Sequence, residues 1–496
     1  MHALLAEPIS SRASASKTQT ITARRRLYLG DAKSRLRLSR FTHVVACDDG
    51  FVGLFNALNL AVVGLRKSVA DRLLAHTVVS TETLQCLCEQ SDALLPELER
   101  QGILVSIEHN ENHELATARE HLNHTPIGIL YLLLTDACNL RCQYCYIEAA
   151  IPPEYQTSKM NAQVARNSID LFARALRRSH SSIEEPQIIF YGGEPFLNWD
   201  TMLVALGYIR EQVAAAVIPD NTGVTINTNG TLVTEEMARA LKRFPFVTVA
   251  VSVDGPPEVH DGMRLDLIGR GSYERTDAGI RRLQAAGVNV GLCCTLTANN
   301  LHRAEEILLW LRQTYDISAL GFNLLIANKG TFASSGEYAE QVAEAVIRTF
   351  RVGRREGIYE DRMMRKVRSF VKGKINFYDC GGCGGQLVIA PDGQVGVCQA
   401  YCGTRQYFTD VAPGFDPFEH EYWKEWRQRS PISMEQCEGC IALGNCGGGC
   451  AYAAHAMHGN IRALDDNFCT FSKKAIEFLV RDLIASMHCQ PGQPNV

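Results

Sequence analysis

The stretch LTDACNLRCQYCYIE, residues 134–148, is the most informative segment of this 496-residue chain. Its cysteines, Cys138, Cys142 and Cys145, are separated by three and two residues. Three thiolates from one loop can bind three irons of a [4Fe–4S] cluster and leave the fourth iron open for a substrate or cofactor. A zinc site would need a fourth protein ligand nearby, and the neighbouring sequence offers none. The spacing therefore predicts an iron–sulfur cluster with an open iron.

Around this loop the chain alternates short apolar runs with amphipathic helical patterns. The runs predict six strands, at 127–134, 186–191, 223–227, 247–253, 289–296 and 319–325. Helical patterns between them cover 161–175, 201–213, 234–244, 273–286 and 304–315. Strands joined by helices in one direction form a parallel sheet covered by helices. We therefore expect an α/β fold, with a partial (β/α)6, TIM-like barrel over 126–330 and its chemistry at the carboxyl ends of the strands.

Three polar motifs fall at those strand ends. In FYGGEP, 190–195, Gly192 and Gly193 permit close approach of the backbone to a ligand, and Glu194 can accept hydrogen bonds from an ammonium group. TINTNGT, 225–231, offers Asn227 and Asn229, although asparagines near glycine also form ordinary turns. VSVDGPPEVHDGMR, 251–264, supplies Ser252 and Arg264. The alternative roles are a strand-end cap for Ser252 and a surface salt bridge for Arg264.

A second group of cysteines lies between residues 380 and 469. This segment is rich in glycine and cysteine and has little regular pattern, so it needs a metal to hold it together. A zinc ribbon is the simpler alternative for four of the cysteines, Cys437, Cys440, Cys446 and Cys450.

The cysteine loop and the GGEP motif resemble those of the radical S-adenosylmethionine (SAM) superfamily. In that family SAM chelates the open iron, and its reductive cleavage gives a 5′-deoxyadenosyl radical that abstracts a substrate hydrogen. The resemblance implies that Tyr144 lies beside the adenine, that the Gly192–Gly193–Glu194 motif meets the SAM amino group, and that Asn227 reaches the ribose. It also implies SAM contacts for Ser252 and Arg264, the guanidinium pairing with the SAM carboxylate, and, by spacing alone, an adenine contact for Leu325.

The later cysteines are similar to the SPASM domain, the auxiliary-cluster extension of radical SAM enzymes. The resemblance implies two auxiliary [4Fe–4S] clusters that transfer electrons. One would be held by Cys383, Cys398 and Cys450, and the other by Cys437, Cys440, Cys446 and Cys469. Cys380 is the expected fourth ligand of the first cluster, with Cys402 or an open position as alternatives.

The remaining segments suggest further domains. Residues 1–40 carry nine Lys or Arg against two acidic residues, which favours a flexible basic tail over a transit peptide. Residues 41–125 predict a winged-helix-like peptide-recognition module, with strands at 41–47 and 102–107, helices at 69–74, 81–90 and 94–101, and a polar linker at 108–122. Residues 331–379 predict a helical bridge, with helices at 336–350 and 363–371. The SPASM domain then covers 380–496 and ends in a helix at 472–487.

Composition narrows the partners. A net charge of −4 gives no reason to expect nucleic acid or an anionic membrane. No apolar run approaches the roughly 18 residues that span a bilayer. The chain has no secretion signal, and clustered cysteines of this spacing favour a cytoplasmic metalloenzyme over a disulfide-bonded protein.

The SPASM resemblance implies a peptide or protein substrate and a flavodoxin- or ferredoxin-type reductant. The first hypothesis is a maturase that forms a thioether, carbon–carbon or ether crosslink, or an epimer, in a ribosomally made, leader-bearing precursor peptide. The second is a sulfatase-maturing enzyme that makes formylglycine. That group has an aspartate, the proposed base, directly after the cysteine equivalent to Cys398. This chain has Gln399 there, which disfavours formylglycine chemistry. Asp379, beside Cys380, is a weak candidate for the catalytic base in its place. Hypotheses of another class are a non-catalytic electron carrier and a zinc protein.

Overall fold

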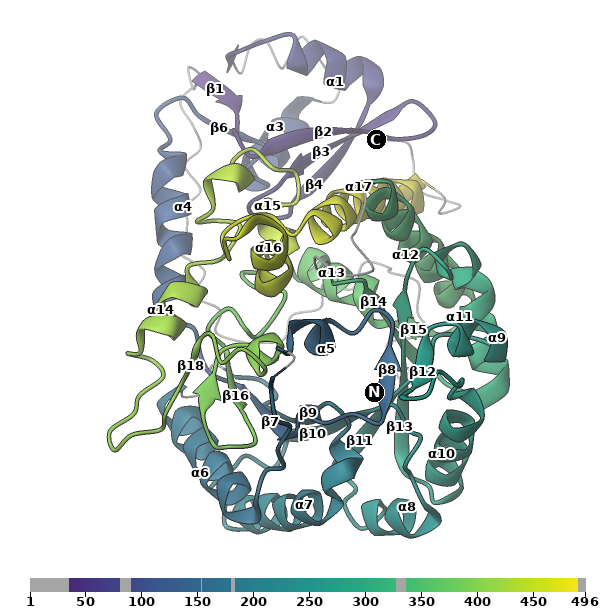
Figure 1. The fold of residues 1–496 in the computed structure, drawn as a ribbon. Coiled ribbons are helices and arrows are strands. Elements are labelled where there is room, and N and C mark those ends of the chain that lie inside the picture. The colour runs from purple at the N-terminus through teal and green to yellow at the C-terminus, as the bar shows by residue number, and fades with distance from the viewer. Residues whose placement is uncertain (1–34, 81–90, 153, 180–182, 327–335, 489–496) are drawn as a thin grey trace.

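The computed structural model describes residues 35–80, 91–152, 154–179, 183–326 and 336–488. A partly closed parallel sheet forms its centre (Figure 1). All six predicted barrel strands are confirmed within a few residues, as β7 (Ile129–Thr135), β9 (Gln187–Gly192), β10 (Gly223–Thr228), β11 (Val247–Ser252), β13 (Asn289–Leu296) and β14 (Ala319–Leu324). The helices between them pack outside the sheet, as α6 (Ala162–Ser179), α7 (Trp199–Ala214), α8 (Glu235–Leu241), α10 (Tyr273–Ala285) and α11 (Ala304–Tyr315).

The sheet continues beyond the six strands on both sides. Its order is β15-β14-β13-β11-β10-β9-β7-β16-β17-β18. The added strands are β15 (Tyr359–Glu360), β16 (Gln386–Ile389), β17 (Val395–Gly396) and β18 (Phe408–Thr409). β16 runs parallel to β7, with Gln386 opposite Ile129. The cysteine-rich segment therefore begins as an extension of the barrel sheet, beside the strand that leads into the Cys138 loop.

The N-terminal module contains more strands than the sequence suggested. One sheet is formed by β1 (Arg35–Leu38), β5 (Val79–Ser80) and β6 (Leu104–Ser106), and a second by β2 (Thr42–Ala46), β3 (Phe51–Asn56) and β4 (Val62–Arg66). Helices α1 (Lys67–Leu74) and α3 (Ser91–Arg100) complete it. Residues 35–38, expected in a basic tail, pair as a strand instead, while residues 1–34 and the helix predicted at 81–90 lie outside the described residues.

The polar linker expected at 108–122 is wrong, because this segment contains helix α4 (Glu111–Glu120). The Asn110 side chain caps it by accepting a hydrogen bond from the Asn112 amide. The buried Glu111 carboxylate accepts hydrogen bonds from Arg37 at 2.6 Å and Ser39 at 2.5 Å. α4 is held by its cap and by the Glu111 contacts and has no apolar stripe, so the hydrophobic periodicity of the sequence did not reveal it.

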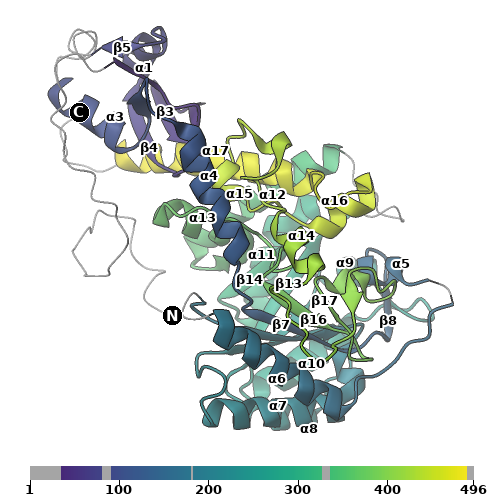
Figure 2. The same cartoon turned by 90° about the vertical axis from the view of Figure 1, so that its left-hand side faces the viewer.

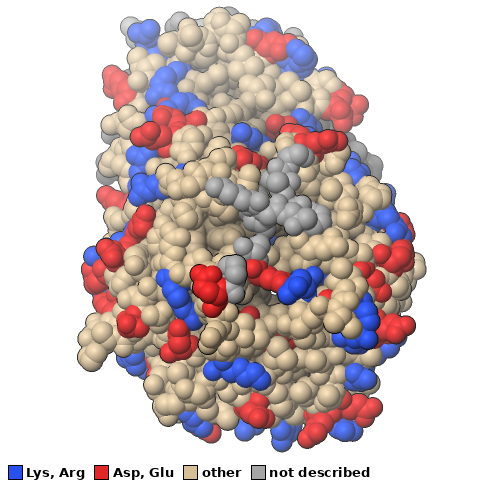
Figure 3. Space-filling model, in the orientation of Figure 1, with Lys and Arg blue, Asp and Glu red and all other residues tan. Residues whose placement is uncertain are grey.

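Long helices join the module to the barrel (Figure 2). They are α12 (Gly336–Glu356) and α13 (Asp361–Lys372), which confirm the helices predicted at 336–350 and 363–371, and the final helix α17 (Asp466–His488). α17 packs so closely on the β2–β3–β4 sheet that a Cβ at Gly53 would lie 2.6 Å from Val480. No helix among the described residues is long and apolar enough to cross a membrane. Acidic and basic side chains are interspersed over the face shown in Figure 3.

Candidate active site and cysteine clusters

The Cys138 loop connects β7 to the short helix α5 (Tyr146–Ala150) at the carboxyl end of the barrel strands. The three cysteines are half-buried and lie near one another. Burial, together with repulsion from the other two cysteines, raises the pKa of Cys138 to about 12. Backbone amides point at the sulfurs, from Leu140 to Cys138 Sγ at 3.4 Å and from Glu148 to Cys145 Sγ at 3.5 Å. Three gathered sulfurs that accept amide hydrogen bonds fit an iron–sulfur cluster, whose sulfurs are commonly hydrogen-bonded.

The glycines of the GGEP motif clamp this loop. The amide of Gly193 donates to Thr135 O and that of Glu194 to Ala137 O, both at 2.9 Å. Gly192 has a φ of +135°, and a Cβ there would lie 2.0 Å from Thr135 O. A Cβ at Gly193 would lie 2.1 Å from Ala137 O. Both glycines are therefore required by the contact between the end of β9 and the backbone that leads into Cys138.

Glu194 is buried beside the loop without an ion-pair partner among the described residues. Its carboxylate accepts hydrogen bonds from Thr228 Oγ1 at 2.7 Å, the Asn229 amide at 2.8 Å and the Phe196 amide at 3.1 Å. Burial nevertheless raises the pKa of Glu194 to about 7. A buried carboxylate that lacks a counter-charge fits the amino group of a ligand such as SAM.

Arg264 lies next to the loop because β8 (Leu140–Cys142) pairs antiparallel with β12 (Arg264–Asp266), placing Arg264 opposite Cys142. Its Nε donates to Asp254 Oδ2 at 2.8 Å and its Nη2 to Asp254 Oδ1 at 3.4 Å. Its Nη1, the nitrogen not bound to Asp254, lies 3.9 Å from Cys142 Sγ. Tyr144 donates to the same carboxylate at 2.5 Å, and the guanidinium lies over its ring. Asp254 thus orients Tyr144 and Arg264, two of the predicted SAM-binding residues.

The role of Asp254 was not assigned from the sequence, although it stands in the same motif as Ser252 and Arg264. The residue is fully buried. Burial opposes its ionisation, but the neighbouring Arg264 charge keeps the pKa of Asp254 below its usual value. Asp254 Oδ1 also accepts the Thr295 amide at 3.0 Å, which anchors the pair to the end of β13. The signal available in the sequence was an acidic residue two positions after the strand end.

The other predicted SAM-binding residues lie at strand ends. Asn227 and Ser252 are half-buried between buried neighbours of β10 and β11, on the alternate face from the core residues. Ser252 Oγ lies 3.6 Å from Cys293 Sγ on β13. Asn229 Nδ2 contacts Asn139 at 2.9 Å and Cys138 Sγ at 3.9 Å, so it supports the loop. Leu325 follows β14 and is buried, with its amide bound to Tyr338 Oη.

The first auxiliary group contains four mutually close cysteines. Burial raises the pKa of Cys398 well above its usual value, and repulsion from Cys450, Cys380 and Cys383 adds to this rise. The amide of Gly382 points at Cys380 Sγ and that of Ala453 at Cys450 Sγ, both at 3.4 Å. This grouping favours Cys380 as the fourth ligand of the predicted first auxiliary cluster.

The rival residue, Cys402, lies elsewhere. Its sulfur accepts a hydrogen bond from Arg405 Nη1 at 3.1 Å. Burial raises its pKa to about 11, and the charged groups that act on it are Arg405, Asp136 and Asp392 rather than the auxiliary cysteines.

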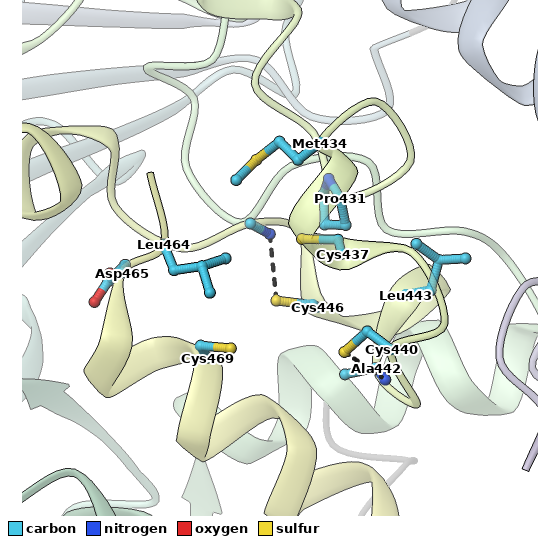
Figure 4. Close-up of a pocket in the computed structure, with 11 residues that line it drawn as sticks. Pro431, Met434, Cys437, Cys440, Ala442, Leu443, Cys446, Leu464, Asp465 and Cys469 are labelled. Atoms are coloured by element: carbon cyan, nitrogen blue, oxygen red, sulfur yellow. Dashed lines mark hydrogen bonds between the residues drawn. The ribbon is translucent and has the colours of Figure 1, made fainter. Parts of the chain in front are cut away.

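The second auxiliary group surrounds one pocket (Figure 4), to which Cys437, Cys440, Cys446 and Cys469 contribute. Burial and repulsion from the other three raise the pKa of Cys437 to about 12. Cys469, rather than Cys450, completes this set, which disfavours a zinc ribbon. Among the described residues no three side chains converge as tightly as the ligands of a single metal ion. A four-iron cube carries one thiolate on each iron, so it spaces its ligands more widely.

Asp379 lies in a buried ion pair. Its carboxylate is 3.4 Å from Lys366 Nζ and 3.5 Å from Arg362 Nη1. Burial opposes its ionisation, but the charges of Lys366 and Arg362 lower the pKa of Asp379 below its usual value. A carboxylate held by two cations is a weak base, so the geometry does not favour Asp379 as the catalytic base.

Comparison with known proteins agrees with this geometry. Residues 132–311 match the model of the radical SAM superfamily. The chain is 24% identical over 476 residues to the radical SAM cyclopropyl synthase TigE of Paramaledivibacter caminithermalis, covering 90% of this chain and 96% of that protein. It is 22% identical over 377 residues to a cysteine-type anaerobic sulfatase-maturating enzyme of Clostridium perfringens, covering 72% and 98%. The fold is similar to native anSMEcpe with bound AdoMet and Cp18Cys peptide (TM-score 0.60, 18% identity, 74% of this chain and 100% of that chain).

A partial α/β barrel with a three-cysteine loop clamped by a glycine–glutamate motif is the arrangement expected where an iron–sulfur cluster binds a small cofactor. Residues 132–311, which contain this loop and motif, are similar to the radical SAM superfamily. The chain is therefore an enzyme, rather than a non-catalytic electron carrier or a zinc protein, and that superfamily uses SAM and a [4Fe–4S] cluster.

Replacing Gly192 tests the clamp. In Gly192→Ala the new Cβ would meet Thr135 O, so the backbone before Cys138 must move. We expect the reconstituted protein to lose about four irons, the content of one cluster. Iron and acid-labile sulfide per chain measure this. Gly207→Ala, a helical glycine whose Cβ meets nothing within 4 Å, is the control and should keep full iron. Full iron in Gly192→Ala would contradict the clamp.

SAM affinity should depend on pH through Glu194. With a pKa of about 7, its carboxylate fraction increases between pH 6 and 7.5, so the Kd for SAM should fall by up to about eightfold over that interval. Equilibrium dialysis with reconstituted protein measures the Kd at both pH values. Glu194→Gln should bind more weakly and show no such dependence. The same Kd for the unaltered protein at both pH values would argue against an ammonium–Glu194 contact.

Proposed function

We propose that this protein is a peptide maturase, which uses the SAM-derived radical to crosslink or epimerise a residue of a ribosomally made precursor peptide. The observation that carries this proposal is the N-terminal module. Its β1–β5–β6 sheet, β3, β4 and its helices enclose a hydrophobic core of their own, apart from the barrel core, with Leu36, Val52, Leu54, Val63 and Leu98 among its members.

The module offers strand edges to a peptide. Among the described residues β4 pairs only with β3, so its other side carries backbone groups without a strand partner. Val63 and Leu65 point into the module core, while Gly64 and Arg66 are exposed. A leader segment can add to such an edge as a further strand, with its backbone providing the affinity.

The chemistry is assigned to the carboxyl ends of the barrel strands. Bound SAM at the cluster supplies the radical that abstracts hydrogen. Glu194 holds the amino end of SAM, while Asp254 fixes Arg264 and Tyr144 beside the Cys138 loop. Burial of Glu194, Asp254 and Arg264 excludes water from these polar contacts.

The position of Gln399 favours a reaction other than formylglycine formation. Its Nε2 lies 3.5 Å from Tyr146 Oη, and Tyr146 Oη lies 3.3 Å from Tyr191 Oη. Each of these residues is next to a residue of a predicted site. Tyr146 follows Cys145 of the Cys138 loop, Tyr191 precedes Gly192 of the GGEP motif, and Gln399 follows Cys398 of the first auxiliary group. Gln399 thus lies between the Cys138 loop and the first auxiliary group, at the position where the sulfatase-maturing enzymes have an aspartate as the proposed base. The neutral side-chain amide of glutamine cannot act as a base in its place.

The relatives support the same choice. The alignment with the cyclopropyl synthase covers 90% of this chain, whereas that with the sulfatase-maturating enzyme covers 72%. A cyclopropyl group is closed by carbon–carbon bonds, so among the possible crosslinks we favour carbon–carbon bond formation. In this proposal the two auxiliary clusters take up the electron left on the substrate, and a flavodoxin- or ferredoxin-type protein supplies the electron for SAM cleavage.

Mass spectrometry tests the function. The reconstituted enzyme is incubated anaerobically with SAM, a strong reductant and the peptide encoded by the short open reading frame nearest this gene. We expect a crosslinked product that has lost two hydrogens or, when the reaction is run in D2O and returned to H2O, an epimer that retains one deuterium on carbon. Deuterium exchange should also become slower at residues 62–66 when the full peptide binds, and not when its leader half is removed. An unmodified peptide that leaves exchange at 62–66 unchanged would contradict the proposal.

A further inference from the structure

A fully buried guanidinium lies between the two auxiliary groups of cysteines. Arg429, two residues beyond helix α14 (Glu421–Arg427), is 0% exposed. It donates hydrogen bonds to five backbone carbonyls and to the Cys383 side chain. Nη1 donates to Gly448 O at 2.6 Å and Gly449 O at 3.2 Å, Nη2 donates to Ala463 O at 3.2 Å and Cys450 O at 3.5 Å, and Nε donates to Ile461 O.

Three of these carbonyls, those of Gly448, Gly449 and Cys450, belong to the short link 447–450 that joins the two groups. Cys446 belongs to the second group and Cys450 to the first, and three glycines separate them. Gly447, Gly448 and Gly449 have φ angles of +79°, +84° and +69°, which side-chain-bearing residues rarely adopt. A Cβ at Gly448 would lie 3.2 Å from Arg429 Nη1. The three glycines therefore let this turn place its carbonyls on one guanidinium.

The positive charge of Arg429 lacks an ion-pair partner in the part of the chain that the structure describes. A second buried cation nearby, Lys366, has Asp379 at 3.4 Å. Arg429 does influence Asp465, but burial still raises the pKa of that carboxyl, and the two form no ion pair. Arginine stays charged in proteins, and a buried cation without a counter-charge is strongly destabilising. Negative charge must therefore come from another source.

Cysteines of both auxiliary groups surround the guanidinium. Cys383, in the first group, accepts a side-chain hydrogen bond from Arg429, and the carbonyl of Cys450, in the same group, lies 3.5 Å from Arg429 Nη2. The Arg429 charge also acts on Cys437, in the second group. Thiolates bound to iron would supply the missing negative charge at both groups. One guanidinium thus acts on members of both groups.

We propose that Arg429 is the shared counter-charge of the two auxiliary iron–sulfur clusters. It positions the link between Cys446 and Cys450 and raises the reduction potential of both clusters, because a nearby cation stabilises the reduced form, which carries one more negative charge. This inference rests on the proposed assignment of eight cysteines to two clusters.

Redox titration followed by electron paramagnetic resonance tests the proposal. A Cys138→Ala/Cys142→Ala/Cys145→Ala parent removes the SAM cluster, so only the auxiliary clusters give signals. Into this parent are introduced Arg429→Gln, which removes the charge, and Arg429→Lys, which keeps it. The matched control is Arg427→Gln. Arg427 is also buried and donates to the carbonyls of Asn123, Trp423 and Phe418, but the groups that shift its pKa are Tyr378, Glu419 and Asp416.

The expected result is a lower potential for both clusters in Arg429→Gln. At the midpoint of the parent, the reduced-to-oxidised ratio should fall at least tenfold, or 59 mV for a one-electron couple. Arg429→Lys and Arg427→Gln should stay within about threefold of the parent. The proposal is overturned if Arg429→Gln also stays within that range, or if Arg429→Lys shifts as far as Arg429→Gln.

Iron content separates the remaining outcomes. The parent should hold about eight irons; a parent without iron would overturn the two-cluster assignment itself, and this inference with it. If Arg429→Gln loses iron while Arg429→Lys and Arg427→Gln retain it, the charge is required and the proposal stands. If Arg429→Lys also loses iron, the shape of arginine rather than its charge is essential, and the proposal fails.

Discussion

The backbone contact between the end of β9 and the loop after β7 is the constraint on which the site depends. Gly193 and Glu194 donate to carbonyls at residues 135 and 137, immediately before Cys138. The same three residues, 192–194, supply the buried Glu194 carboxylate. One contact therefore fixes the first cysteine and the acceptor for a cationic ligand relative to each other, and it tolerates no side chain at either glycine. Across the barrel, Asp254 performs the equivalent task for Arg264 and Tyr144.

The cysteine-rich segment is organised around its thiols rather than around a conventional core alone. β16 joins it to the barrel sheet beside β7, so the auxiliary groups are built onto the strand that leads to the Cys138 loop. The eight auxiliary cysteines are buried or half-buried, and the buried Arg429 beside them has no ion-pair partner among the described residues, so the segment needs further negative charge and further bonds. Folding of this segment is therefore coupled to occupancy of its clusters in our account. The Tyr146–Gln399 contact lies between the loop and the first auxiliary group.

The sequence was sufficient for the barrel and its cysteine groups, because apolar strands and fixed cysteine spacings are local signals. It was insufficient where structure depends on partners distant in the chain. β3 contains a glycine, Gly53, whose reason is the packing of α17, and α4 is held by an ion pair between the buried Glu111 and the half-buried Arg37 rather than by an apolar stripe. The choice of Cys380 over Cys402 needed three-dimensional proximity. Arg429 left no signal, since most of its acceptors are backbone carbonyls that the chain brings together only in three dimensions.

Radical formation from SAM at the Cys138 loop is the central claim, and one measurement tests it directly. The anaerobically reconstituted protein is mixed with SAM and a strong reductant, and 5′-deoxyadenosine is quantified by chromatography. The account predicts its release by the unaltered protein and none above background from the Cys138→Ala/Cys142→Ala/Cys145→Ala variant. Release of 5′-deoxyadenosine by that variant at the rate of the unaltered protein would contradict the account.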